Sequence, residues 1–96
     1  MPDFILLMHA PAGDEAMADW TPYLDGLAAK GALRGGSAIG GGVAMRRDGA
    51  EAAVSASLSG FVRIVADDLD QAQALVAGNP TYEAGGTVEV RELPVT

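Results

Sequence analysis

The sequence contains no cysteine and only one histidine, His9. Disulfide bonds, thiolate chemistry and cysteine-based or histidine-rich metal sites are therefore excluded. Basic residues are scarce as well: 6 lysines and arginines stand against 13 acidic residues, which gives a formal net charge of −7. Binding to nucleic acid or to an anionic membrane requires a cationic surface, so the composition argues against both partners.

Long apolar stretches are also missing. No run approaches the roughly 20 residues that a membrane-spanning helix needs, and Met1-Pro2-Asp3 lacks the basic segment with which a signal peptide begins. We therefore expect a soluble cytoplasmic protein. The 96 residues are 49% hydrophobic and 20% charged, which is typical of a globular chain and predicts a single domain over residues 1–96.

Four segments are predicted to be strands. Residues 4–8 form a continuous apolar run, typical of a strand buried on both faces, and residues 61–66 form a second clear strand. Residues 87–91 alternate strictly between polar and apolar side chains, which also indicates a strand. Residues 32–39 predict a weaker strand, in which a pair of glycines indicates a bulge or a close approach of backbones.

The segment between residues 40 and 59 has weaker patterns. Its triple glycine at 40–42 indicates a flexible turn, residues 43–47 predict a further strand, and residues 47–49 predict a tight turn. Residues 50–59, rich in alanine and serine, fit either an irregular loop or a weak edge strand.

Two helices are predicted. The first is capped by Asp14, ends at Gly31, and has apolar residues at spacings of three and four: Met17, Trp20, Leu24, Leu27 and Ala28. Pro22 either kinks this helix or occupies the first position of a helix that Thr21 caps.

The second helix is predicted to begin at Asp68, which forms a variant capping box with Gln71. Its apolar face consists of Leu69, Ala72, Leu75 and Val76. Gly78 suits the position just beyond the end of this helix.

This order of elements is typical of an α+β domain with a ferredoxin-like βαββαβ antiparallel sheet. Right-handed crossovers place both helices on one face of the sheet, with strands 4–8 and 61–66 in its centre. The opposite face then exposes Phe61, Val65 and half of the first strand. At about 25 cal/mol per Å² of apolar area, covering them is favourable, so we expect a homodimer through this face. The alternative is that residues 50–59 cover it.

Few residues are candidates for a functional site. His9 ends the first strand and can act as an acid or base near pH 7, or it is simply a hydrogen-bonded surface histidine. Tyr82 and Glu83 lie in the loop after the second helix, which either rims a pocket or only connects elements. Trp20 either lines a ligand pocket or packs in the core. Arg63 is expected to form an ion pair across strands, near Glu89 and Arg91, or across a dimer. Binding a ligand carboxylate is the alternative for Arg63.

Known catalytic and cofactor motifs are missing from the sequence. We find no Ser-His-Asp set, no phosphate-binding loop and no metal-ligand spacing, so we expect neither a cofactor nor a metal. The pair Asp67-Asp68 is explained better by helix capping than by a carboxylate dyad. The triple glycine lacks the strand–turn–helix setting of a dinucleotide-binding fingerprint.

Four segments together resemble the YCII-related family, including its DGPF branch: FILLMHA, W followed by YLDGLAAKGALRGGSAI, GFVRIVADDLDQAQAL, and NPTYEAGGTVEVREL. The likeness covers most of the chain, and GGTVEVREL and GF…ADDLDQA are its most specific parts. The resemblance implies a ferredoxin-like domain that pairs as a dimeric α+β barrel. This agrees with the argument from the two apolar faces of the central strands.

The chain departs from the family at two places. SASLSGF replaces the Asp-Gly-Pro-Phe element of the DGPF branch. The family often has a histidine on the first helix and an aspartate before a proline near the end of the second, which have been suspected as a catalytic pair. A rough alignment places Trp20 and Asn79 at these positions, and neither side chain can do acid–base work.

Some members of the family resemble dehydrochlorinases that act on chlorinated aromatics. For this chain, the missing pair makes a dimeric small-molecule binding module without catalysis the leading hypothesis. The first alternative is a small enzyme of lyase or isomerase type, in which His9 acts as acid or base on a small or aromatic substrate, assisted by Tyr82 or Glu83. A cavity shared by His9 and residues 79–86 would favour it. The second alternative, a purely structural domain, would be favoured if no cavity existed.

Overall fold

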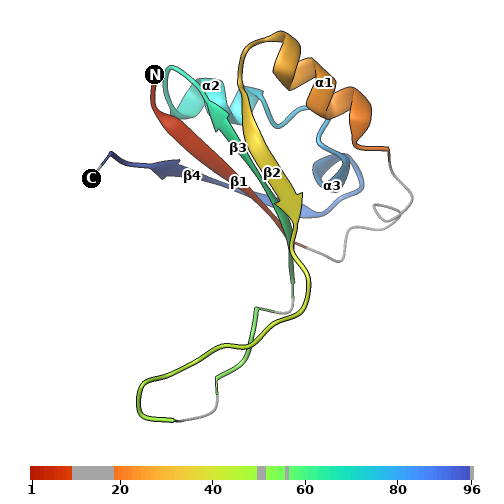
Figure 1. Ribbon diagram of the computed structural model, residues 1–96. Helices are drawn as coiled ribbons and strands as arrows, with labels where there is room; N and C mark the ends of the chain where they lie inside the picture. The colour runs from red at the N-terminus through yellow and green to blue at the C-terminus, as the bar shows by residue number, and fades with distance from the viewer. Residues whose placement is uncertain (10–18, 50–51, 56, 96) are drawn as a thin grey trace.

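The computed structural model describes residues 1–9, 19–49, 52–55 and 57–95. The elements in this part of the chain are β1 (Asp3–His9), α1 (Thr21–Ala29), β2 (Leu33–Ala38), β3 (Leu58–Val65), α2 (Leu69–Ala74), α3 (Pro80–Glu83) and β4 (Thr87–Leu93). The strands form an antiparallel sheet in the order β2-β3-β1-β4 (Figure 1). The predicted ferredoxin-like fold is confirmed, with β1 and β3 in the centre.

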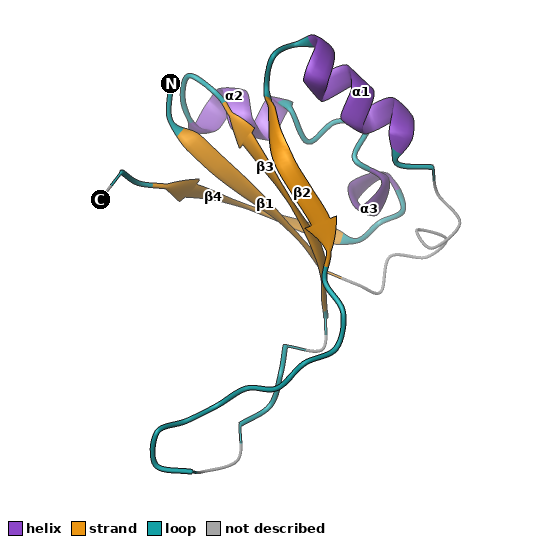
Figure 2. Cartoon of the chain, viewed as in Figure 1, coloured by secondary structure: helices purple, strands orange, loops and turns teal. Residues whose placement is uncertain are grey.

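The helices lie on one face of the sheet (Figure 2). Alternate residues of the central strands point toward them, because successive side chains of a strand point to opposite faces. Phe4, Leu6 and Met8 of β1 are at most 3% exposed, and they form the core with the apolar side chains of β3 and the helices, Tyr23, Leu27, Val62, Ile64, Ala66, Ala72 and Val76. None of the described helices is long and apolar enough to cross a membrane.

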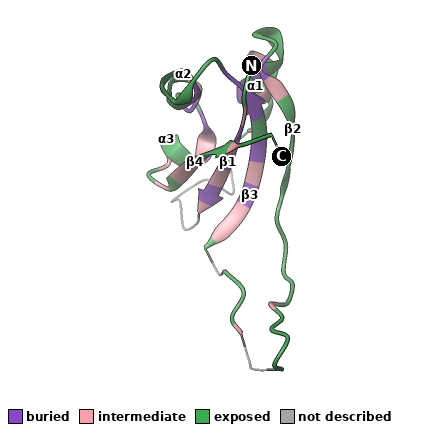
Figure 3. Ribbon diagram, turned by 90° about the vertical axis from the view of Figure 1, so that its left-hand side faces the viewer, coloured by how far each residue is buried: buried purple, intermediate pink, exposed green. Residues whose placement is uncertain are grey.

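The segment between β2 and β3 leaves the sheet as an extended arm, of which residues 39–49, 52–55 and 57 are described (Figure 3). The strand predicted at 43–47 is wrong. These residues have no neighbouring strand, and Val43 and Met45 are 83% and 87% exposed. The turn at 47–49 is confirmed, since the Gly49 N–H donates to the Arg46 carbonyl at 3.1 Å. In the segment 50–59, the described residues up to 57 are irregular, as the first alternative proposed, whereas residues 58–59 begin β3.

Helix α1 begins with Thr21 and Pro22, so the proline marks a helix start rather than a kink. The residue at the N-cap is Trp20, not Thr21, and the Thr21 N–H donates to the Asp19 carboxylate at 2.9 Å. Gly31 follows the helix with φ +71, a conformation that favours glycine. The predicted cap at Asp14 and the apolar residue at 17 lie outside the described residues.

Helix α2 is capped as predicted, because the Asp68 carboxylate accepts the Gln71 N–H at 2.8 Å. The Gln71 side chain in turn accepts the N–H of Asp67, one residue before the expected position. The helix ends at Ala74, earlier than expected, and Leu69 is 49% exposed rather than part of the buried face.

The loop predicted after Gly78 contains the short helix α3, which the sequence analysis missed. Asn79 caps it by accepting the Tyr82 N–H at 3.2 Å, and Pro80 occupies its first turn. Gly85 then adopts φ +92 before β4 begins. In β4, Val88 and Val90 pair with Met8 and Leu6 and face the helices.

The face of the sheet opposite the helices is called the open face here. It consists of Asp3, Ile5, Leu7 and His9 of β1 with their cross-strand neighbours Phe61, Arg63, Val65, Thr87, Glu89, Arg91 and Leu93. Ile5, Leu7 and Phe61 are only partly buried, whereas Val65, which was expected to be exposed, is 7% exposed. Residues 39–49 and 52–55 of the arm extend beyond the end of the sheet (Figure 3), so they do not supply the cover that the alternative to a dimer required.

Candidate functional site

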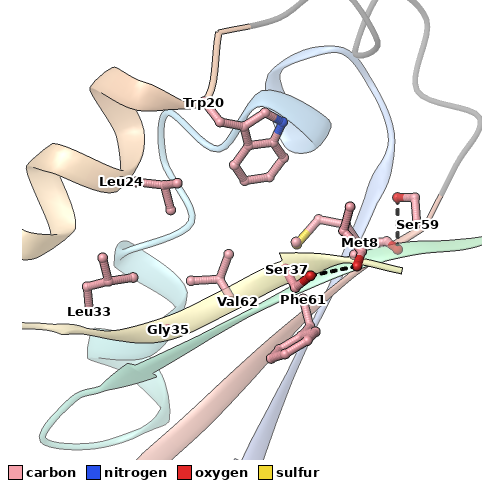
Figure 4. Close-up of a pocket in the computed structure, with 12 residues that line it drawn as sticks. Met8, Trp20, Leu24, Leu33, Gly35, Ser37, Ser59, Phe61 and Val62 are labelled. Atoms are coloured by element: carbon pink, nitrogen blue, oxygen red, sulfur yellow. Dashed lines mark hydrogen bonds between the residues drawn. The ribbon is translucent and has the colours of Figure 1, made fainter. Parts of the chain in front are cut away.

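A cavity of about 540 Å³ lies between the start of α1 and the helix-facing side of β1, β2 and β3. Figure 4 shows the Trp20 ring above the strands, with Leu24 beside it and Met8, Leu33 and Val62 on the other side of the space. The Phe61 ring points away to the open face. The cavity is therefore bounded by apolar side chains from α1 and from three strands.

Glycines on β2 and β3 leave the space open. Gly36 pairs with Val62, and a Cβ atom at Gly36 would lie 2.5 Å from the Phe61 carbonyl oxygen. At Gly60 a Cβ atom would lie 3.1 Å from the Ser37 carbonyl oxygen. The close pairing of β2 with β3 thus requires glycine at Gly36, and the missing side chains leave room beneath Trp20. A bulge between Leu33 and Gly35, which the glycine pair predicted, shifts the register at this point.

Trp20, at the N-cap of α1, is held in place by its neighbours. Its ring packs edge-to-face on Tyr23, with centroids 6.0 Å apart and an interplanar angle of 73°. Its carbonyl accepts the Leu24 N–H at 3.0 Å. The structure shows no hydrogen bond from the indole N–H to a described residue.

Polar groups around the cavity are few. The Ser37 hydroxyl donates to the Ala38 carbonyl at 2.8 Å, and the Ser59 hydroxyl donates to the Met8 carbonyl at 3.3 Å. Among the described lining residues none has a titratable side chain. The site is therefore suited to holding an apolar molecule and has no acid or base of its own.

The other predicted ligand-binding residues lie elsewhere. Tyr82 is 53% exposed on α3, and the Glu83 carboxylate accepts the Gly78 N–H at 3.4 Å. Arg63 is on the open face, where it forms an ion pair with Asp3 at 3.2 Å. The cross-strand pair was expected, but its partner is Asp3, because β1 separates β3 from Glu89 on β4. Of the predicted ligand-binding residues, only Trp20 lines the cavity.

His9 lies on the open face, away from this cavity. Its Nδ1 is 3.1 Å from the Ser57 hydroxyl, and its Nε2 is 3.1 Å from Oε1 of Glu89. Oε2 of Glu89 accepts a bond from Arg91 at 2.8 Å. Two hydrogen bonds hold the pKa of the Glu89 carboxyl below its ordinary value: the one from Arg91 has the larger effect, and the one from His9 the smaller. Sequence reasoning missed Ser57 and the role of Glu89, because strand pairing rather than spacing brings them to His9.

Two further polar side chains, Tyr23 on α1 and Asn79 after α2, are buried. The Tyr23 hydroxyl donates to the Leu75 carbonyl at 2.7 Å. Burial raises the pKa of the Tyr23 phenol, and the side chain of Asn79 acts in the opposite direction. The α1 side chain next to Asn79 is thus Tyr23. A phenol with a raised pKa stays protonated at neutral pH, so this pair also lacks a ready base.

The sequence matches a known protein family. The YCII-related domain matches residues 2–94. The chain belongs to the YCII-related family. No curated protein matches the sequence.

Among solved structures, the chain is similar to the 5-chloro-2-hydroxyhydroquinone dehydrochlorinase TftG from Burkholderia phenoliruptrix AC1100, in complex with 2,5-dihydroxybenzoquinone. The identity is 18%, the TM-score is 0.61, and the match covers 96% of this chain and 93% of that one. At this identity the similarity shows a shared fold.

Proposed function

We propose that this YCII-related chain is a homodimeric module that binds a small, flat, apolar molecule under Trp20, without acid–base catalysis at that site. The observation that supports this most directly is the cavity itself. Its volume of about 540 Å³ lies within the range of roughly 300–1,000 Å³ that is usual for small-molecule sites. Its walls are apolar side chains and glycine backbone.

The shape of the cavity favours a ring-shaped ligand. The floor is formed by strand backbone at Gly36 and Gly60 and the roof by the aromatic ring of Trp20, and flat surfaces of this kind stack well on planar molecules. The solved structure of TftG holds 2,5-dihydroxybenzoquinone, a small ring compound. We therefore expect hydroxylated or quinoid single rings to be the first ligands to test.

Trp20 provides a built-in reporter, because it is the only tryptophan of the chain. Its fluorescence should change when a ring compound such as catechol, hydroquinone or 2,5-dihydroxybenzoquinone enters the cavity. Bound ligand should also raise the melting temperature, since a concentration of 100 times Kd stabilises the native state by about 2.7 kcal/mol. Corrections for absorption by the ligand at the excitation wavelength are made with free tryptophan.

A pair of variants localises the binding. Leu24→Phe adds bulk inside the cavity and should weaken binding at least about tenfold, whereas Leu69→Phe makes the same change on an exposed face of α2 and should leave Kd unchanged. Equal affinity of both variants, or no melting shift with any of the ring compounds, would refute the proposed site.

The dimer is proposed through the open face. Ile5, Leu7 and Phe61 are only partly buried there, and the described arm does not cover them. Light scattering at micromolar concentration should give twice the mass of the chain. Phe61→Asp should dissociate or unfold the protein, because it places a charge in an apolar interface, whereas Phe61→Leu should remain dimeric. A monomeric wild type would overturn this part of the proposal.

The alternative enzyme, in which Tyr82 or Glu83 assists His9, has less support from the geometry. The cavity under Trp20 contains neither His9 nor any residue of 79–86. The described hydrogen-bond partners of His9 are Ser57 and Glu89. The existence of the cavity also argues against a purely structural domain.

A further inference from the structure

The hydrogen bonds around His9 have a defined direction. An ionised Glu89 carboxylate can only accept, and the Arg91 guanidinium on its other oxygen favours the ionised form. His9 must therefore donate from Nε2 to Glu89. In a neutral imidazole the other nitrogen, Nδ1, then has a free lone pair. With His9 neutral, the Ser57 hydroxyl at 3.1 Å donates its proton to that lone pair.

This direction is the one that activates a serine. A base that accepts the hydroxyl proton, and is itself oriented by a carboxylate on its second nitrogen, is the arrangement of nucleophilic triads. In this chain Nδ1 faces the serine and Nε2 faces the carboxylate, and either nitrogen of an imidazole can accept a proton. In the single chain Ser57 is exposed and the side chain of His9 is 25% exposed. Both lie at the end of the open face from which the arm leaves, beyond Ile5, Leu7 and Phe61, on which the proposed dimer contact is centred, so a small molecule can reach the hydroxyl.

A β-bulge lies next to this contact. Met8 pairs with Gly60, but the next residue, His9, pairs with Leu58, so β3 has one extra residue at Ser59. With regular pairing His9 would lie opposite Ser59, two residues from Ser57, whereas the bulge places it opposite Leu58, the residue next to Ser57. Bulges often re-aim side chains next to active sites. This irregularity is an observation separate from the hydrogen bonds.

We propose that Ser57, His9 and Glu89 form a nucleophilic site on the open face that reacts with small activated esters. The Ser57 Oγ attacks the carbonyl carbon as His9 Nδ1 takes its proton. The bond from the carbonyl carbon to the leaving oxygen then breaks, and that oxygen receives the proton from His9. Water releases the acyl group from Ser57 by the same route. This activity is separate from ligand binding under Trp20 and does not depend on it.

The test uses the full chain in the assembly that it forms in solution, with diisopropyl fluorophosphate as the probe. Ser57 Oγ forms a bond to phosphorus, fluoride leaves, and the hydroxyl proton passes to His9. Intact-protein mass spectrometry measures the rate of labelling, and peptide mapping identifies the labelled residue. We expect one label on Ser57, none on Ser57→Ala, and hydrolysis of 4-nitrophenyl acetate that the label abolishes.

Variants separate activation from mere exposure. His9→Asn should slow labelling of Ser57 by at least about 100-fold, the usual contribution of a general base, and Glu89→Gln should slow it by a smaller factor. Ser55→Ala removes a neighbouring exposed serine and should label at the wild-type rate. The proposal is overturned if the wild type acquires no label at Ser57. It is also overturned if folded His9→Asn labels as fast as the wild type.

Discussion

Replacing Gly36 by alanine tests the close pairing of β2 with β3 that forms the floor of the cavity. The added Cβ atom would lie 2.5 Å from the Phe61 carbonyl oxygen and 3.0 Å from the Val62 Cα atom. Both neighbours are backbone, so they cannot swing aside as a flexible side chain would. To restore ordinary contact, which begins at 3.4 Å, the edge strand must move by about 1 Å.

The expected cost is that of overpacking, about 1–3 kcal/mol. For a domain of this size, each kcal/mol lowers Tm by about 4–8 °C, so the variant should melt about 4–24 °C below the wild type. The matched control is Gly41→Ala in the arm. A Cβ atom there meets nothing within 4 Å, and Gly41 does not have a positive φ. The control should be neutral or up to about 1 kcal/mol more stable, because alanine restricts the unfolded chain.

Thermal melting followed by circular dichroism, with urea unfolding as a second measure, decides the matter. If the two alanine variants melt within about 2 °C of each other, they differ in stability by roughly half a kcal/mol or less. Such a result would mean that β2 does not approach β3 as closely as the structure has it. In that case the floor of the cavity would have to be redrawn.

Two further predictions concern titratable groups. Tyr23→Phe leaves the Leu75 carbonyl without its donor and should cost about 1–3 kcal/mol at neutral pH. Because the folded pKa of Tyr23 is raised above 10.0, the wild type should lose this advantage as pH rises through that range. Urea unfolding should therefore show the two proteins converging in alkali, and a constant difference would contradict the assignment. Arg91→Gln should raise the pKa of Glu89 in an NMR titration, since the bond from Arg91 is the main cause of its low value. His9→Asn should raise it less, and the reverse order would refute this account. The stability that Glu89 contributes is lost as pH falls through its folded pKa.

The sheet was predictable because the apolar patterns of its two central strands can be recognised within a few consecutive residues. Residues 4–8 and 61–66 are apolar enough to require burial, and that requirement places them in the centre of any sheet. The segment at 43–47 has a similar local pattern but no partner strand, and a strand without a partner does not form. At 79–80 the error is the opposite one. The residues after the second helix were predicted to be a loop, although asparagine at an N-cap followed by proline is typical of a helix start.

The candidate site was less predictable, because it depends on register. Trp20 was named from its position on an apolar stripe, but the space beneath it exists only because Gly36 is paired against Val62. The contact of Ser57 with His9 lies beside a register shift, with one extra residue at Ser59. A bulge of this kind leaves no pattern in a short serine- and alanine-rich segment. The absence of a Ser-His-Asp motif from the sequence does not exclude a serine, a histidine and a glutamate that come together from separate segments.

The central position of β1 also sets the order in which the fold can be completed. Asp3 pairs with Val65 on one side and with Leu93 on the other, so the first strand must wait for segments that lie far along the chain. Such distant pairings slow folding, because a long loop must close before its contacts form. Until β4 arrives, the apolar strand β1 has an unpaired edge, which is a site for association between chains. We therefore expect refolding yield to depend on protein concentration more strongly than the small size of the domain suggests, and shortening the arm should speed refolding.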